Sequence, residues 1–226
     1  MTQNLPAVED DFDSVEQAIA AIAAGGFAVV VDDTDRENEG DLIIAAEKIT
    51  AQQMAFLVRY SSGVVCVALT GERLDQLQLP LMVSSNNESQ RTAFTVTVDY
   101  LHGTSTGISA ADRAATLRAL ADSRIPASDF ARPGHIFPLR YAPGGVLARP
   151  GHTEAALDLS RLAGLAPAGV LCEIVNDDGS MARRPELLRF ARQHGLPIIT
   201  IADLIAYRER TEMAGLEVAT PVGVPA

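Results

Sequence analysis

Five acidic residues occupy alternate positions in the segment DTDRENEGD at 33–41. They are Asp33, Asp35, Glu37, Glu39 and Asp41. In an extended chain this period of two places all five carboxylates on one face, where they repel one another unless a cation or shared protons compensate. Hard divalent ions prefer such oxygen ligands. A solvated acidic turn is the alternative. Because the segment lies between two apolar runs and contains Arg36, which can grip a carboxylate or phosphate, we favour a metal or ligand site.

The tetrapeptide Arg-Pro-Gly-His occurs twice, beginning at Arg132 and at Arg149. The two copies together contain two of the four histidines in the chain. The second copy leads into TEAALDLSRL, so residues 151–153 are expected at a helix N-terminus, whose free N–H groups and dipole favour an anion. Together with Arg149 they form a candidate phosphate cradle. His152 could complete a metal site with the acidic segment, and His135 could transfer protons near neutral pH. Loop punctuation with exposed histidines is the alternative.

A carboxylate interrupts the apolar run VLCEIV, where Glu173 stands at a position that should be apolar in a buried strand. Burying an unpaired carboxylate is expensive, so Glu173 is either catalytic or part of a structural ion pair. We favour the catalytic role because the sequence offers other acids and histidines.

The segment GTSTG at 103–107 fits the nucleophile elbow of serine hydrolases, with Ser105 as the nucleophile. It lies between a predicted strand and a predicted helix. No HGGG-type oxyanion segment accompanies it, and a hydrolase leaves the acidic segment and both Arg-Pro-Gly-His copies unexplained. The other interpretation is a polar loop that holds a phosphate or sugar hydroxyls.

The composition limits the classes of partner. The 226 residues carry a net charge of −11, which argues against binding to nucleic acid or to an acidic membrane surface. A small ligand is expected instead. The first residues contain acids where a signal peptide would carry Lys or Arg, and the longest apolar run is too short to span a membrane, so a cytoplasmic location is expected. Cys66 and Cys172 lie in apolar runs and are expected to be buried, reduced thiols.

Helices and strands alternate along most of the chain. Capping boxes begin helices at Ser14 and Thr50, and apolar spacing predicts further helices at 109–122, 153–164, 185–195 and 202–210. Strands are predicted at 27–33, 42–46, 64–69, 93–100, 169–175 and 197–201. This order predicts one α/β domain at 14–210, a three-layer αβα sandwich around a mixed sheet. Flexible ends are expected at 1–13 and 211–226.

Five motifs follow one another in an order that is more specific than any one of them. They are DRENEGD at 35–41, STGISAADR at 105–113, RPGHIFPLR at 132–140, GGVLARPGHTEA at 144–155 and PAGVLCEIVNDDG at 167–179. Together, from about residue 27 to 208, the chain resembles the 3,4-dihydroxy-2-butanone 4-phosphate synthase family. The resemblance implies a riboflavin-pathway lyase that converts ribulose 5-phosphate to 3,4-dihydroxy-2-butanone 4-phosphate and formate, without a redox cofactor. Many members continue into a GTP cyclohydrolase II domain, and this second activity is not expected in these 226 residues.

The resemblance also implies a magnesium or manganese ion and a set of substrate contacts. It makes Glu37 and His152 the metal ligands. Substrate contacts would come from Arg36 and Asp41 at the sugar, and from Arg149, Gly151 and Thr153 at the phosphate. A non-catalytic module that binds a phosphosugar or a metal remains an alternative.

The acid–base residues implied by the family are His135 and Glu173, with Glu39 sharing in the proton transfers. The family also implies a homodimer with active sites near the subunit interface, across which Thr106 or Asp112 would act on the substrate.

Overall fold

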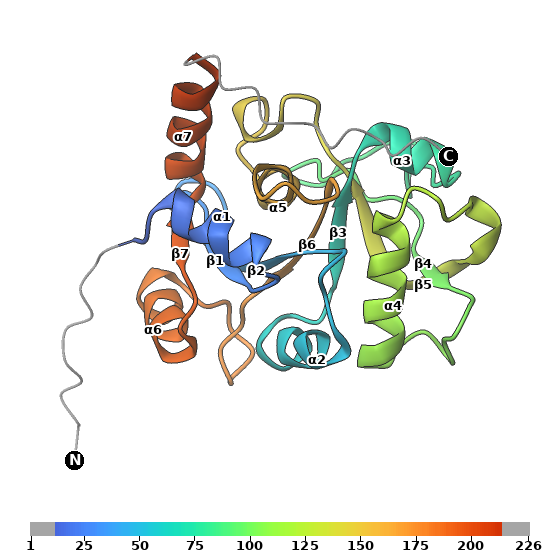
Figure 1. Ribbon diagram of the computed structural model, residues 1–226. Coiled ribbons are helices and arrows are strands. Elements are labelled where there is room, and N and C mark those ends of the chain that lie inside the picture. Colours follow the sequence, from blue (N-terminus) through green and yellow to red (C-terminus); the bar gives the residue numbers. More distant parts are fainter. Residues whose placement is uncertain (1–11, 214–226) are drawn as a thin grey trace.

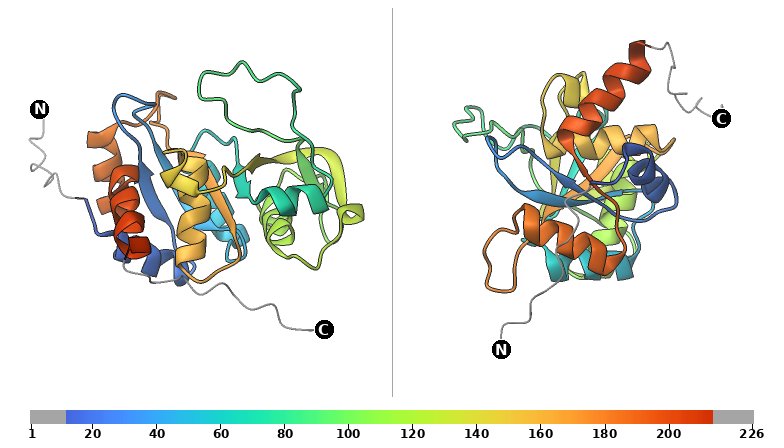
Figure 2. Two further views of the ribbon diagram at one scale, coloured as in Figure 1. Left: turned by 90° about the horizontal axis from the view of Figure 1, so that it is seen from above. Right: turned by 90° about the vertical axis from the view of Figure 1, so that its left-hand side faces the viewer.

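A seven-stranded mixed sheet forms the centre of the molecule, with helices on both of its faces (Figures 1 and 2). The computed structural model describes residues 12–213. The strand order is β4-β5-β3-β6-β2-β1-β7. The strands are β1 (Ala28–Val31), β2 (Gly40–Ala45), β3 (Cys66–Leu69), β4 (Val98–Tyr100), β5 (Phe130–Arg140), β6 (Ala168–Glu173) and β7 (Ile198–Thr200). The helices are α1 (Val15–Ala23), α2 (Ala51–Tyr60), α3 (Gly71–Gln76), α4 (Ala110–Ala121), α5 (His152–Leu162), α6 (Arg184–His194) and α7 (Ile201–Met213), with short 3₁₀ turns η1 (Ala127–Asp129) and η2 (Gly145–Leu147).

Two hydrophobic cores lie on the two faces of the sheet, because successive side chains of a strand point to opposite sides. In β1, Val29 belongs to the core covered by α2, α4 and α6, whereas Val30 belongs to the core covered by α1, α5 and α7. The three-layer αβα arrangement is therefore confirmed. The sheet is mixed, as predicted, since β1 pairs in parallel with β7 and β3 with β5, and the other pairs are antiparallel.

The predicted helix starts agree with the structure. Ser14 and Thr50 each accept a hydrogen bond from the backbone three residues on, and the glutamine at that position returns one, which completes both capping boxes. Helix α6 ends at Gly195, whose φ of 62° is the left-handed conformation that glycine adopts freely.

Strand β5 is the main omission of the sequence-based prediction, which places no strand at 130–140. Proline is tolerated because β5 bonds to β3 through other residues, such as Phe137, whose N–H donates to Val65. Pro138 faces the opposite side, where its carbonyl accepts from the N–H of Thr95. The predicted strand at 93–100 is correspondingly shortened to β4, preceded by isolated bridges.

The expected ends of the domain are only partly described. Asp13, placed by the sequence in the N-terminal segment, accepts hydrogen bonds from Ile198 N and Arg192 Nη1 at 2.8 and 2.7 Å. Helix α7 continues to Met213, beyond the expected end at 210. Residues 1–11 and 214–226 lie outside the described part of the chain.

Both cysteines are buried and free, as predicted. Cys66 and Cys172 lie on the adjacent strands β3 and β6, but their side chains belong to different cores. None of the helices between residues 12 and 213 is sufficiently long and apolar to cross a membrane.

Candidate active site

Several predicted site residues meet at one edge of the sheet because of strand register. Asp41 of β2 pairs directly with Glu173, the last residue of β6. Cys66 of β3 pairs with both Phe137 of β5 and Leu171 of β6. His135 lies two residues before Phe137 in β5, and Glu173 lies two residues after Leu171 in β6, so both are at the same end of β3. Strand β3 runs between them and separates their backbones by about 10 Å.

The acidic segment connects β1 to β2 as a turn and is not extended, so the predicted row of five carboxylates is wrong. Backbone bonds from Arg36 N and Asn38 N to the carbonyl of Asp33 curl the segment, and Asn38 adopts a φ of 55°. As a result Asp33 and Asp35 are exposed, Glu37 and Glu39 are half-buried, and Asp41 is buried. Only the last three carboxylates can contribute to an enclosed site.

Asp32 organises this turn, and the sequence analysis missed it. Its buried carboxylate accepts hydrogen bonds from Glu37 N at 3.0 Å, Glu39 N at 2.8 Å and Arg36 Nη1 at 3.0 Å. The available signal was its position as the first acid after a fully buried strand. Arg183 supports the turn from the other side, since its guanidinium donates to the carbonyls of Glu37 and Asn38.

We expect Asp32→Asn to lower the free energy of unfolding by about 1–3 kcal/mol. The asparagine NH₂ group would replace a carboxylate oxygen that accepts a hydrogen bond from a backbone N–H, so two donors would face each other. Metal binding should weaken as Glu37 loses its fixed position. Urea unfolding and Mn²⁺ binding followed by electron paramagnetic resonance would measure the two effects. Wild-type values for both would exclude an organising role for Asp32.

A candidate metal centre lies beside the turn, where ligand atoms of Asp32, Glu37 and His152 fall within 4.8 Å of one another. His152 Nδ1 is 3.4 Å from Glu37 Oε2. Among residues 12–213, Asp41 Oδ1 and His152 Nε2 are buried side-chain atoms without a hydrogen-bond partner. Since buried polar atoms are normally satisfied, these atoms and the surrounding carboxylates fit a cation held by oxygen and nitrogen ligands.

The electrostatics of these groups follow from burial and mutual repulsion. Burial raises the pKa of Asp41 to about 7, and burial with the nearby charge of Glu37 raises the pKa of Glu39. Contact with His152 is the main reason that the pKa of Glu37 is lowered. For His152, the neighbouring carboxylates outweigh the opposing effect of burial and raise its pKa. The site therefore favours positive charge, either a proton or a metal ion.

The N-terminus of α5 offers an anion site next to this centre. Its N-cap is Gly151, which provides no side-chain cap for the first N–H groups. A Cβ atom at Gly151 would lie 2.5 Å from Arg149 Nη1 and 3.1 Å from Arg36 Nη2, so two guanidinium groups flank this glycine closely. Thr153 is buried in the first turn. Cations, free N–H groups and the helix dipole together suit a phosphate.

Arg149 is held in place by its own contacts. Nη1 lies 2.6 Å from Glu154 Oε2, whose side chain is 1% exposed. Nη2 donates to the carbonyl of Gln90 at 3.1 Å and to Thr92 Oγ1 at 3.2 Å. The guanidinium thus joins the start of α5 to the loop before β4.

His135 is oriented by Asp99, which the sequence analysis did not single out. Asp99 accepts from the backbone N–H of His135 at 2.8 Å and lies 2.6 Å from its Nδ1. Gly107, with a φ of 93°, leaves the room for this pair, since a Cβ there would lie 2.7 Å from His135 Nδ1. Thr106 is exposed immediately before this glycine.

Glu173 is half-buried at the end of β6 and is oriented by Ser62, whose Oγ donates to Glu173 Oε2 at 2.5 Å. No ion pair of Glu173 is found within the described residues, so the structural alternative for this carboxylate lacks a partner there.

Ser105 occupies a structural position. Its Oγ donates to Asp112 Oδ2 at 2.7 Å, and Gly107 N donates to the same oxygen at 3.1 Å. The hydroxyl therefore meets a carboxylate where a hydrolase would need a base such as His. Asp112 is buried, and its carboxylate stabilises this loop by accepting both hydrogen bonds.

The two remaining histidines lie elsewhere. His102 is exposed near Asp129. His194, predicted to be a surface residue, is half-buried because its ring packs against Phe56, Tyr60 and Phe190 with centroids 4.5–5.1 Å apart.

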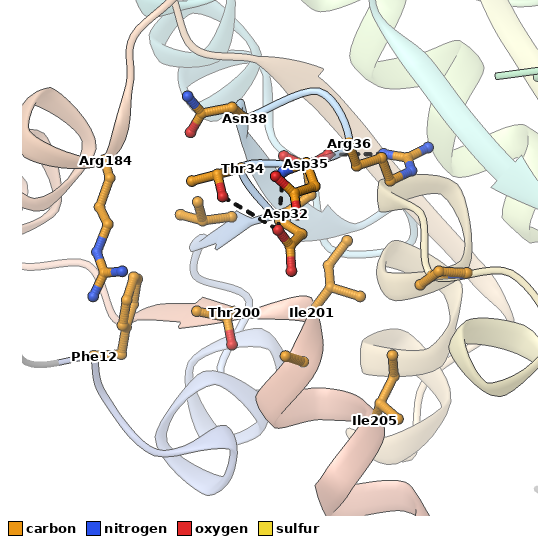
Figure 3. Close-up of a pocket in the computed structure, with 14 residues that line it drawn as sticks. Phe12, Asp32, Thr34, Asp35, Arg36, Asn38, Arg184, Thr200, Ile201 and Ile205 are labelled. Carbon is orange, nitrogen blue, oxygen red and sulfur yellow. Dashed lines mark hydrogen bonds and ion pairs between the residues drawn. The ribbon is translucent and has the colours of Figure 1, made fainter. Parts of the chain in front are cut away.

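A cavity of about 450 Å³ adjoins the acidic turn (Figure 3). Asp32 and Arg36 line it from the turn, and Ile201 and Ile205 line it from α7. Asp32 is thus shared by this cavity and the candidate metal centre, whereas Glu37 and His152 are not among the lining residues.

Comparison with known proteins identifies the family. The sequence pattern of 3,4-dihydroxy-2-butanone 4-phosphate synthase matches residues 16–207. The chain belongs to this family. The 3,4-dihydroxy-2-butanone 4-phosphate synthase of Agrobacterium fabrum is 62% identical over 193 residues, which cover 85% of this chain and 91% of that protein. The family resemblance inferred from the five motifs is thus confirmed.

Related synthases include both short and long chains. This chain is 62% identical over 201 residues to the riboflavin biosynthesis protein RibBA of Salinispora arenicola, but the match covers 89% of this chain and only 48% of that protein. The chain therefore spans about half the length of such relatives.

Solved synthase structures share the fold over most of the chain. A crystal structure of 3,4-dihydroxy-2-butanone 4-phosphate synthase in complex with two magnesium ions superposes with a TM-score of 0.86 at 50% identity, covering 89% of this chain and 99% of that one. The synthase of Candida albicans gives a TM-score of 0.82 at 54% identity, covering 87% of this chain and 98% of that one. The serine hydrolase alternative finds no support in these comparisons.

Proposed function

We propose that this chain converts D-ribulose 5-phosphate to L-3,4-dihydroxy-2-butanone 4-phosphate and formate with a magnesium or manganese ion. The observation that carries the proposal is the meeting, at one sheet edge, of a carboxylate–histidine metal centre, an anion site at the start of α5, and the acid–base candidates Glu173 and His135. Membership of the synthase family supports the same reaction.

Glu37 and His152 would hold the metal ion. Asp32 lies close enough to join them, but its oxygens already accept three hydrogen bonds, so we assign it to holding the turn. When bound, the ion stabilises the negative charge that develops on the sugar oxygens during enolisation. A related synthase crystallised with two magnesium ions, which supports the choice of metal.

The substrate would lie between α5 and the acidic turn. Arg149, Thr153 and the N–H groups after Gly151 would bind the phosphate, and the α5 dipole would add to the attraction. Arg36 and Asp41 would contact the sugar hydroxyls, as would Thr106 from the neighbouring loop.

Proton transfers would fall to His135, Glu173 and Glu39. With Nδ1 turned to Asp99, His135 would present Nε2 to the substrate. Ser62 fixes one oxygen of Glu173 and leaves the other to take a proton. The raised pKa of Glu39 brings this carboxyl group closer to neutrality, which suits an acid–base group.

We also infer a homodimer in the cytoplasm. Large apolar side chains are exposed in the segments around Glu173 and His135: Val64 at 42%, Leu101 at 52% and Ile108 at 51%. Exposed apolar surface beside a site fits an interface with a second copy. Two free buried cysteines fit a reducing compartment. Sedimentation equilibrium giving a single chain mass would contradict the dimer.

Arg149→Ala should raise KM for ribulose 5-phosphate by about 10–100-fold while kcat changes little, because a charged contact to the phosphate is lost in both ground and transition states. Steady-state kinetics would measure the change. Arg161→Ala, in the last turn of α5, is the matched control and should keep the wild-type KM. An unchanged KM in Arg149→Ala would place the phosphate elsewhere.

A proton NMR time course with ribulose 5-phosphate and magnesium tests the function directly. Formate should appear with metal and be absent when EDTA is added. Substrate that binds but remains unchanged would favour a non-catalytic phosphosugar-binding module. Labelling of Ser105 by a fluorophosphonate would restore the hydrolase alternative.

A further inference from the structure

The segment 86–92, between α3 and β4, has no role in the proposed mechanism, yet it contacts the arginine that is assigned to the phosphate. Arg149 Nη2 donates to the carbonyl of Gln90 at 3.1 Å and to Thr92 Oγ1 at 3.2 Å. Both acceptors therefore meet a single nitrogen of the guanidinium group. We call this segment the 86–92 loop.

The 86–92 loop is closed by hydrogen bonds among its own residues. Glu88 Oε1 accepts from Gln90 N at 2.8 Å, and Glu88 Oε2 accepts from Thr92 N at 2.9 Å. Asn86 Nδ2 donates to the carbonyl of Thr92 at 2.9 Å. The bonds from Gln90 N and Thr92 N lower the pKa of Glu88 to about 2, so its carboxylate is charged at neutral pH. The loop thus holds its two acceptors for Arg149 in a fixed arrangement.

A left-handed residue lies between the two acceptors. Arg91 has a φ of 51°, a conformation that costs free energy in residues other than glycine. With this bend, the carbonyl before Arg91 and the hydroxyl after it both reach Nη2 of Arg149. Backbone strain persists where the surrounding structure fixes it, and such places are often ligand sites.

The other terminal nitrogen of Arg149 is held by α5. Nη1 lies 2.6 Å from Glu154 Oε2, and the second oxygen of this buried carboxylate accepts from Ala142 N at 3.1 Å. A guanidinium group has five N–H groups, and the contacts to the 86–92 loop and to Glu154 use three of them. The N–H of Nε and one N–H of Nη1 remain. Nη1 lies beside the N-cap of α5, since a Cβ atom on Gly151 would be 2.5 Å from it.

We propose that Thr92 is a positioning residue, whose hydroxyl group, together with the carbonyl of Gln90, directs the remaining N–H groups of Arg149 at the phosphate of the substrate. An arginine that is fixed on both sides loses less side-chain entropy when it binds an anion. Because Thr92 acts through Arg149, its effect belongs to substrate binding and not to the chemical step. The inference rests on the proposed function for the identity of the substrate.

Thr92→Val is the first test, because valine has the shape of threonine but cannot accept a hydrogen bond. The KM for ribulose 5-phosphate should rise about 3–10-fold, while kcat should stay within about twofold of the wild type. Thr92→Ser keeps the hydroxyl group and should have a KM close to that of the wild type. Thr211→Val is the matched control: it makes the same change in α7, where the hydroxyl group donates to the carbonyl of Tyr207, and should keep the wild-type KM.

A double variant tests whether Thr92 acts through Arg149. In the Arg149→Ala background, Thr92→Val should raise KM no further, because the guanidinium group that Thr92 positions is absent. A further rise of about 3–10-fold in this background would show that the two residues act independently, and the proposal would be wrong.

Phosphorus NMR titration with inorganic phosphate, in metal-free buffer and without substrate, measures the anion site independently of turnover. Thr92→Val should bind phosphate about 3–10-fold more weakly than the wild type, and Arg149→Ala should bind it at least as weakly as Thr92→Val. Equal phosphate affinity of the wild type and Thr92→Val would overturn the proposal, as would a lower kcat of Thr92→Val at an unchanged KM. Weaker phosphate binding by Thr92→Val in a protein that leaves ribulose 5-phosphate unchanged would support the positioning role and refute the proposed reaction.

Discussion

Glu37→Gln should reduce metal-dependent formate release from ribulose 5-phosphate by at least about 10³-fold in kcat/KM, equivalent to about 4 kcal/mol of transition-state stabilisation. The substitution preserves the shape of the side chain but removes the charge that faces His152 and Arg36. A neutral amide is a much poorer ligand for a hard divalent ion. Formate production by proton NMR would give the rate, and Mn²⁺ binding by electron paramagnetic resonance would report the metal without relying on activity.

Asp35→Asn is the matched control for this experiment. Asp35 belongs to the same turn, carries the same charge and is exposed. It should keep wild-type metal binding and turnover. If the two variants lose activity equally, the general negative charge of the turn is responsible and Glu37 is not a specific ligand.

Glu173→Gln should lower kcat by about 10²–10⁴-fold, because a glutamine at the end of β6 can still accept the hydrogen bond from Ser62 but cannot take up or release a proton. Mn²⁺ binding should remain close to that of the wild type, since Glu173 is not assigned to the metal. Rapid-quench measurement of substrate loss together with Mn²⁺ titration would separate the chemical step from binding.

Two further variants sharpen this second prediction. Ser62→Ala should lower kcat by only about tenfold, because it loosens Glu173 without removing the carboxylate. Glu47→Gln serves as the control, because Glu47 is an exposed glutamate that accepts a hydrogen bond from Ala166 N. Full activity in Glu173→Gln would remove Glu173 from the acid–base groups and leave His135 and Glu39.

Local patterns predicted most of the elements because their causes are local. Capping boxes at Ser14 and Thr50 satisfy N–H groups three residues away, and apolar runs identify strands that are covered on both faces. Strand β5 was missed because the rule that proline disrupts sheets ignores which side of the strand the proline faces. That side depends on the positions of β3 and of Thr95.

The candidate site shows the same division. Its charged side chains were recognised from type and spacing, yet the predicted face of five carboxylates was wrong, since Asp32 and Arg183 hold the segment in a turn. The sequence contained no local mark for Asp99 or Ser62, because each acts on a partner in a distant segment.

The sequence by itself determined the family, the alternating helices and strands, and the residue types available for metal, phosphate and proton chemistry, since all of these reside in short motifs and their order. Only the tertiary structure decided which carboxylates are enclosed and which groups orient His135 and Glu173. Strand register and helix packing bring remote segments together, and burial sets the energetic cost of each charge, so neither can be derived from spacing along the chain.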